Sequence, residues 1–156
     1  MSMEEDNKAR QRRVFDEALN KGNMAVVDEL IDTNYLSESP QGIVKGPEGM
    51  KQGWINLRAA FPDIHFTIED MITEGDKVVS RIICKGTHKG EFMGIPPTGK
   101  KMTIKGIIIT HWIDGKEVET WEVIDMLGMM QQLEILPTIE EIIQQNKEYH
   151  NSTPSN

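Results

Sequence analysis

Hydrophobic side chains in the first 60 residues recur at the spacing of helices. One apolar stripe lies before Gly22, and a second follows Asn23. A third begins after Pro47, where proline suits the first turn of a helix, and ends at Pro62. We therefore predict three amphipathic helices, with an irregular segment from Tyr35 to Pro40. The apolar positions that define the helices are Val14, Phe15, Ala18 and Leu19, then Val26, Val27, Leu30 and Ile31, and finally Met50, Trp54, Leu57 and Phe61.

After Pro62 the hydrophobic period falls from about 3.6 residues to two, which is typical of strands. Strands are predicted through residues 64–68, 78–87, 102–113 and 117–127. A Gly- and Pro-rich loop joins the second to the third of these. Asp114-Gly115 marks a hairpin between the last two. Residues 138–150 have a helical pattern, and 151–156 are predicted to be disordered.

Helices followed by a meander of long strands indicate the α+β class. We predict a curved antiparallel sheet wrapped around the N-terminal helices, forming a cone. The third helix would cover the concave face and so enclose a pocket, which in most proteins is largely apolar. One domain is expected over residues 1–136, with a C-terminal helix and disordered tail over 137–156.

Charge and composition narrow the choice of partners. The 156 residues include 17 Lys and Arg against 25 Asp and Glu, giving a net charge of −8. Such a surface repels phosphates, so we expect neither nucleic acid nor a membrane as a partner. Cys84 is the single cysteine, which suits a reducing compartment. The polar, acidic N-terminus does not resemble a signal peptide, so a cytoplasmic location is expected.

Asp125 is the candidate for chemistry. Aspartate is depleted in strands, yet Asp125 follows Val123 and precedes Leu127 on one face of the last predicted strand. A buried carboxylate there would find a partner or have a raised pKa, which would make it a general base near neutral pH. The alternative is a structural role as a hydrogen-bond acceptor or strand terminator.

His111 lies on the preceding strand, where it would face Glu117 or Glu119. The alternative for His111 is a half-exposed position near the hairpin, without a catalytic role. No group of His, Cys, Asp and Glu has the spacing of metal ligands, so no metal is assigned.

Three blocks of sequence, in this order and spacing, resemble the SnoaL-like polyketide cyclases, or ester cyclases, of the nuclear-transport-factor-2-like superfamily. The resemblance extends over roughly residues 10–134. The blocks are Gly46-Pro47-Glu48-Gly49 with residues 57–63 (LRAAFPD); residues 86–100 (GTHKGEFMGIPPTGK); and Asp114-Gly115-Lys116 with residues 121–125 (WEVID), 127–128 and 131–133.

The resemblance implies a cone-shaped α+β barrel and a homodimer or homotetramer packed through the sheet. It also implies chemistry without a cofactor: an intramolecular aldol condensation of a polyketide-like methyl ester, in which a strand aspartate moves the proton. Asp125 matches that aspartate, and His111 falls where a pocket histidine can sit. Glu38 occupies a segment that carries a histidine in many relatives. The implied substrate-binding residues are Trp54, Phe61, Phe92, Met93, Trp121 and Glu38.

Two classes of function remain open from the sequence. One is an enzyme that transfers protons on a small hydrophobic carbonyl compound, by cyclisation or isomerisation. The other is a non-catalytic protein of the same fold that binds a hydrophobic ligand or uses its sheet as a scaffold. The first requires a carboxylate that a ligand can reach, whereas the scaffold requires an exposed apolar patch.

Overall fold

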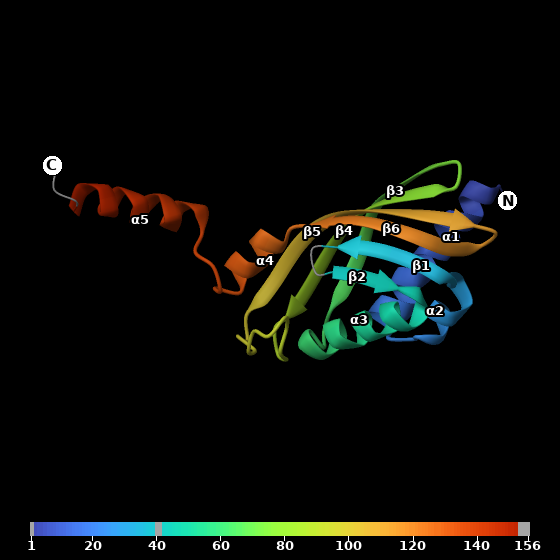
Figure 1. The fold of residues 1–156 in the computed structure, drawn as a ribbon, viewed down its shortest axis with the longest axis horizontal. Coiled ribbons are helices and arrows are strands. Elements are labelled where there is room, and N and C mark those ends of the chain that lie inside the picture. The colour runs from blue at the N-terminus through green and yellow to red at the C-terminus, as the bar shows by residue number, and fades with distance from the viewer. Residues whose placement is uncertain (1, 40–41, 153–156) are drawn as a thin grey trace.

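The computed structural model describes residues 2–39 and 42–152, and it has the predicted α+β architecture (Figure 1). The helices are α1 (Met3–Arg13), η1 (Val14–Asn20), α2 (Ala25–Leu30), α3 (Gly46–Ala60), α4 (Met126–Gln132) and α5 (Ile139–Ser152). The strands are β1 (Ile31–Ser39), β2 (Gly42–Lys45), β3 (His65–Glu74), β4 (Lys77–Thr87), β5 (Lys101–Ile113) and β6 (Lys116–Ile124).

The strands form one sheet of six, in the order β2-β1-β6-β5-β4-β3. All neighbours are antiparallel except β1 and β6, which run parallel. The predicted antiparallel sheet is therefore a mixed sheet. The prediction of an irregular segment from Tyr35 to Pro40 is also wrong up to Ser39, because β1 extends from Ile31 to Ser39 between β2 and β6. Pro40 lies outside the described residues.

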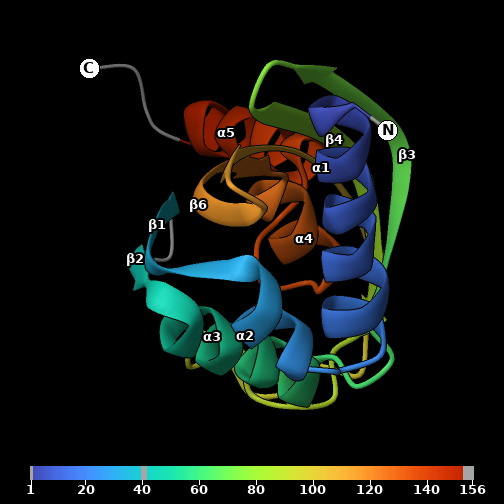
Figure 2. The same ribbon diagram turned by 90° about the vertical axis from the view of Figure 1, so that its right-hand side faces the viewer.

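The sheet curves around the helices that precede it (Figure 2). The α1 helix packs against β3 and β4, while α3 packs against β1 and β2. Apolar side chains fill the space between these layers in two clusters, one around Phe61 and Ile82 and the other around Val27 and Trp112. The concave side of the sheet is thus covered by helices, as the hydrophobic pattern predicts.

Local signals explain where the covering helices begin and end. Ser2 caps α1, because its Oγ accepts the backbone N–H of Glu5 at 3.2 Å. The π-helical stretch η1 continues α1 without a break and buries its apolar stripe in the core. Pro47 lies in the first turn of α3, and that helix ends at Ala60, with Phe61 as its C-cap directly before Pro62.

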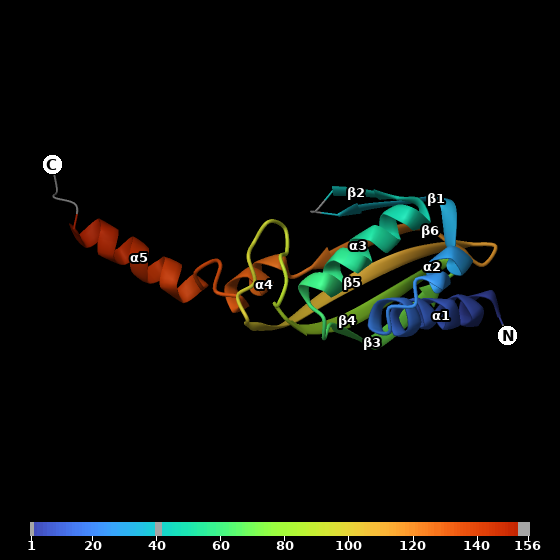
Figure 3. The same ribbon diagram turned by 90° about the horizontal axis from the view of Figure 1, so that it is seen from below.

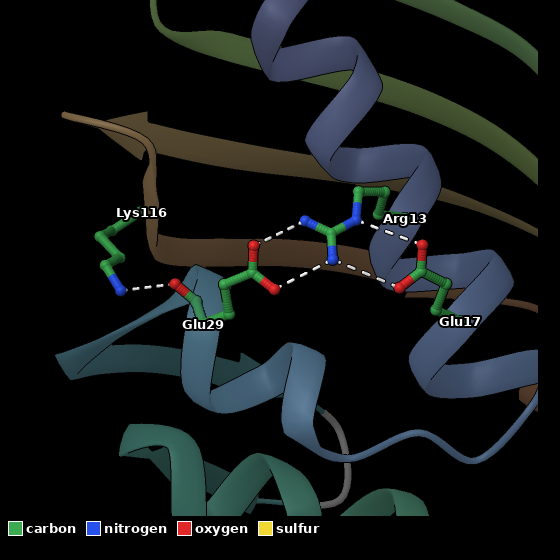
Figure 4. A network of polar contacts seen from close by, with 4 residues as sticks. All are labelled: Arg13, Glu17, Glu29 and Lys116. Carbon is green, nitrogen blue, oxygen red and sulfur yellow. Dashed lines mark hydrogen bonds and ion pairs between the residues drawn. The ribbon is translucent and has the colours of Figure 1, made fainter.

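A network of charged side chains ties α1 to α2 and to the start of β6 (Figure 4). Arg13 donates hydrogen bonds to both carboxylate oxygens of Glu29, at 2.8 and 2.9 Å, and also bonds Glu17. The hydrogen bonds from Arg13 hold the pKa of Glu29 below its usual value. Lys116 Nζ donates to the backbone oxygen of Glu29 at 2.5 Å. These contacts hold the first residue of β6 against the end of α2.

A β-bulge interrupts β6 soon after it begins. Trp112 pairs with Glu117 and His111 with Glu119, so Val118 is an extra residue on the β6 side. From Thr120 to Ile124 the pairing with β5 is regular. Because a shift of one residue exchanges the two faces of a strand, the bulge decides which β6 side chains point into the cone.

The C-terminal helix α5 projects away from the body (Figure 3). None of its described residues is buried. The separation of a domain over residues 1–136 from the segment 137–156 stays a prediction. Asn151 and Ser152, predicted to be disordered, belong to α5, and residues 153–156 lie outside the described part. No helix in the described ranges is long and apolar enough to cross a membrane.

Candidate active site

The concave side of the sheet encloses a cavity of about 850 Å³. Its wall is largely apolar and comes from η1, α3, the inner face of the sheet and the loop between β4 and β5. Exposed lining residues, including Gly53, Asn56 and Met93, form its mouth between α3 and this loop. The other end is closed by buried residues of α1, β1, β5 and β6. The cavity therefore has an open apolar end and a closed end, as the predicted cone requires.

Two carboxylates line the cavity from the inner face of β6, Glu117 and Glu122. Glu117 lies opposite Trp112 and Glu122 opposite Ile108, both of which belong to the buried face of β5. The bulge at Val118 explains why an odd-numbered and an even-numbered residue of one strand share this face. The described residues that line the cavity include no Lys, Arg or His, so no cation neutralises the two carboxylates.

Glu122 is half-buried in the wall of the cavity. Burial raises the pKa of its carboxyl, because the charged form loses hydration. Within the described chain its side chain has neither a hydrogen-bond donor nor an ion-pair partner. A carboxylate that is reachable, partly desolvated and unpaired can accept a proton from a ligand near neutral pH and return it.

Glu117 is almost completely buried at the closed end of the cavity. Its Oε1 accepts a hydrogen bond from Thr120 Oγ1 at 2.5 Å, and Thr120 Oγ1 in turn accepts one from the Tyr35 hydroxyl at 2.8 Å. Burial, together with the nearby charge of Glu122, raises the pKa of Glu117 to about 7, and the bond from Thr120 opposes this rise. Burial also raises the pKa of Tyr35.

Asp125 lies outside the cavity, and its predicted burial is wrong. The strand ends at Ile124, and Asp125 is an exposed residue that caps α4, with Oδ1 accepting the N–H of Gly128 at 2.8 Å. A Cβ at position 128 would lie 2.2 Å from Asp125 Oδ2, so a larger residue than Gly128 would displace this capping side chain. This is the structural alternative that the sequence left open, a hydrogen-bond acceptor at the end of the strand.

Three other predicted site residues lie outside the cavity. His111 is on the outer face of β5, where its Nε2 lies 2.8 Å from Asp76 Oδ2. Its neighbour across the strands is Glu119, as the hairpin spacing predicts. Trp121 is exposed on the outer face of β6, and Glu38 is exposed on β1. The bulge in β6 explains why Trp121 points outward. In β1 the residue that lines the cavity is Ser37 rather than Glu38.

The residues predicted to form the apolar wall agree with the structure better than the predicted catalytic residues do. Trp54, Phe92 and Met93 line the cavity. Phe61 lies behind this wall, fully buried, with its ring stacked on His88 at 5.3 Å and edge-on to Phe92 at 5.4 Å. Phe61 therefore supports the wall without belonging to the lining.

No group of three or more potential ligands in the described chain could hold a metal ion. Cys84 lines the cavity, and burial raises the pKa of its thiol to about 12. A thiol that stays protonated is a poor nucleophile, so Cys84 acts as a small apolar side chain of the cavity wall.

Sequence reasoning missed Glu117 and Glu122. One signal pointed to Glu117: the even positions of β5 are apolar or small, whereas Lys101, Thr103 and Lys105 occupy odd positions. The even positions of β5 therefore form its inner face. Trp112 belongs to this face, and Glu117 lies on the other side of the hairpin from it. Glu117 could have been found from that spacing. Glu122 could not, because nothing in the sequence marks the bulge at Val118.

Comparison with known proteins adds the following. A family model described as SnoaL-like polyketide cyclase matches residues 9–133. The nogalonic acid methyl ester cyclase of Streptomyces nogalater is 31% identical over 121 residues, covering 74% of this chain and 89% of the relative. The aklanonic acid methyl ester cyclase DnrD of Streptomyces peucetius is 30% identical over 131 residues, covering 80% and 89%. TsrD from Streptomyces laurentii has a similar structure, with a TM-score of 0.79 at 26% identity, covering 87% of this chain and all of that one.

Proposed function

The chain belongs to the SnoaL-like polyketide cyclase family, and from this premise we propose that it is a cofactor-free cyclase in which Glu122 transfers the proton. The proposed substrate is a hydrophobic carbonyl compound of the polyketide ester class. The observation that carries the proposal is the half-buried carboxylate of Glu122, which faces an apolar cavity of about 850 Å³ and has no protein partner in the described chain.

The proposed reaction is a ring closure by intramolecular aldol addition. Glu122 accepts a proton from a carbon that lies between two carbonyl groups, which leaves a delocalised enolate. The enolate carbon attacks a second carbonyl of the same molecule, forming one carbon–carbon bond and an alkoxide. The alkoxide then takes the proton from Glu122. Nothing is lost or gained, so the product is an isomer of the substrate.

The apolar wall supports this chemistry in two ways. It raises the pKa of the base toward neutrality, where a general base is most effective. It also holds a flexible substrate folded, so that the two reacting carbons meet as if at high local concentration. Trp54 and Phe92 offer flat apolar surfaces for such a substrate.

The names of two relatives supply substrates for a test, nogalonic acid methyl ester and aklanonic acid methyl ester. Each would be incubated with the protein, and a product of unchanged mass and altered retention time would be sought by liquid chromatography with mass spectrometry. We expect Glu122→Gln to lower kcat by 10²- to 10⁴-fold, about the range for losing a general base. Glu119→Gln is the matched control, because Glu119 is on the same strand but faces outward.

Asp125→Asn distinguishes this proposal from the role that the family resemblance implies for Asp125. We expect full activity, because its carboxylate caps α4 outside the cavity. If Asp125→Asn abolished turnover while Glu122→Gln kept it, the assignment of Glu122 would be wrong. If the wild-type protein bound both esters but converted neither, non-catalytic ligand binding would be the better description.

A further inference from the structure

Gln11 is a polar residue at a position where α1 faces the interior. It lies one helical turn before Val14 and Phe15, which are buried in the core. Gln11 itself is 2% exposed, and it is part of the wall at the closed end of the cavity. Burying an amide is unfavourable unless its donors and its acceptor are hydrogen-bonded. An apolar side chain would fill this position at lower cost, so Gln11 calls for an explanation beyond packing.

The protein satisfies one end of this amide. Thr110 Oγ1 lies 2.7 Å from Gln11 Oε1, a distance typical of an O–H···O bond, so the hydroxyl donates its hydrogen there. Trp112 Nε1, which can only donate, supplies its own hydrogen to the same Thr110 oxygen at 2.8 Å. These two bonds fix the amide of Gln11 with its oxygen toward Thr110 and its nitrogen directed away from it.

The other end of the amide, Nε2, carries two hydrogens and has no hydrogen-bond partner within the described chain. Three unbonded side-chain atoms in this part of the chain are sealed from solvent, namely Ser80 Oγ, His88 Nε2 and Glu117 Oε2. Gln11 Nε2 is not one of them, so accessible space reaches it. Because Gln11 is buried and lines the cavity, that space is the cavity. Its amide hydrogens are therefore available to a molecule bound there.

The charges of the cavity wall decide which kind of oxygen these hydrogens can bind. Glu117 and Glu122 line the cavity, and the described lining residues include no Lys, Arg or His. A carboxylate on the ligand would be repelled by these two side chains, and no cation would compensate. An uncharged carbonyl oxygen accepts a hydrogen bond from the amide without adding charge. The wall therefore favours a ketone or an ester over a free acid.

We propose that Gln11 is a ligand-binding residue whose Nε2–H donates a hydrogen bond to an uncharged carbonyl oxygen, of a ketone or an ester, at the inner end of the ligand. Gln11 then determines which end of the ligand enters first, because the closed end of the cavity offers this donor to a carbonyl group. The inference rests on the proposed function only in taking the cavity as the ligand site. It assigns no step of the reaction to Gln11.

Nuclear magnetic resonance of the wild-type protein tests the hydrogen bond directly. 2-Acetylnaphthalene and 2-isopropenylnaphthalene have the same shape, but only the first has a carbonyl oxygen. The side-chain amide signals of Gln11 would be assigned from their backbone neighbours in proton–nitrogen correlation spectra. We expect at least one amide proton to lie further downfield with the ketone bound than with the hydrocarbon bound, because a hydrogen bond deshields the proton. Equal positions with both probes would overturn the proposal.

Affinity gives an independent measurement, by equilibrium dialysis of both probes. Gln11→Met keeps the length of the side chain but has no amide hydrogens. The ratio of the two dissociation constants should favour the ketone about fivefold more in the wild-type protein than in Gln11→Met, the effect of one net hydrogen bond. Asn7→Leu is the matched control, because Asn7 is buried one turn earlier on α1 but does not line the cavity. Its ratio should equal that of the wild type. Circular dichroism would show that both variants fold, and an equal ratio in Gln11→Met and the wild type would contradict the proposal.

A third probe, 2-naphthoate, tests the choice of an uncharged oxygen. It has the same size as 2-acetylnaphthalene but carries a carboxylate. At pH 8 we expect the wild-type protein to bind it about tenfold more weakly than the ketone. Equal or tighter binding of 2-naphthoate would overturn this choice, and failure of the ketone to bind would overturn the proposal as a whole. No turnover enters these measurements, so their failure is distinct from loss of cyclisation in Glu122→Gln.

Discussion

The buried carboxyl of Glu117 should make the stability of the protein fall as the pH rises, and Glu117→Gln should remove this dependence. Burial raises the pKa of this group from 4.5 to about 7 in the folded protein. Between these two values the folded state binds a proton that the unfolded state has lost, so the free energy of unfolding decreases with pH. Near pH 8, about one unit above the pKa of the folded state, the carboxyl is ionised in both states and the loss is almost complete.

The magnitude follows from the pKa. One pKa unit corresponds to about 1.4 kcal/mol, so the wild-type protein should lose about 2 kcal/mol between pH 5.5 and 8 through this group. The Gln side chain keeps the size and the hydrogen-bonding capacity of protonated Glu117 but does not titrate. Ionisable groups that do not interact with Glu117 act equally in both proteins, so the difference between them reports Glu117 together with its electrostatic coupling to Glu122.

Urea unfolding followed by tryptophan fluorescence would measure the difference, with linear extrapolation to water at each pH. We expect Glu117→Gln to gain about 2 kcal/mol relative to the wild-type protein on going from pH 5.5 to 8. Glu117→Leu, which also lacks the charge, should show the same trend with pH. A difference between variant and wild type that did not change with pH would refute the reasoning, because Glu117 would then not be held protonated by its surroundings.

Three further predictions concern the rest of the chain. Asp125→Ala removes the acceptor for Gly128 N–H, so it should lower the free energy of unfolding by about 1 kcal/mol in urea titrations while turnover is kept. Ending the chain after Leu136 removes α5, whose described residues are all unburied, so the urea midpoint should stay within the small range typical of surface changes. The predicted homodimer or homotetramer through the sheet is tested at Val123, which is 77% exposed on its outer face. Light scattering should give a multimer for the wild-type protein and a smaller mass for Val123→Asp; a monomeric wild type would contradict the prediction.

The fold could be predicted from the sequence where local signals and tertiary packing agree. The apolar stripes at Val14 and Trp54 and the hairpin at Asp114 each indicate one element, and the structure has that element. The strand β1 was missed because Asp32, Asn34 and Glu38 are residues that strands disfavour. Those residues become a strand because β6 and β2 flank them and supply the hydrogen bonds of the ladder. The pairing with β6 joins segments about 80 residues apart, beyond the reach of a local pattern.

Which side chains of β6 line the cavity depends on one extra residue, Val118, and no pattern in the sequence reveals it. If β5 and β6 paired without interruption from Trp112 and Glu117 onward, every odd position of β6 would face inward and the strand would carry Trp121 into the cone. The extra residue Val118 shifts the pairing, so that Ile108 lies opposite Glu122. Trp121 is therefore exposed, and an even-numbered carboxylate enters the cavity. Periodicity specifies that a strand has two faces, but a bulge of one residue decides which side chains of β6 line the cavity.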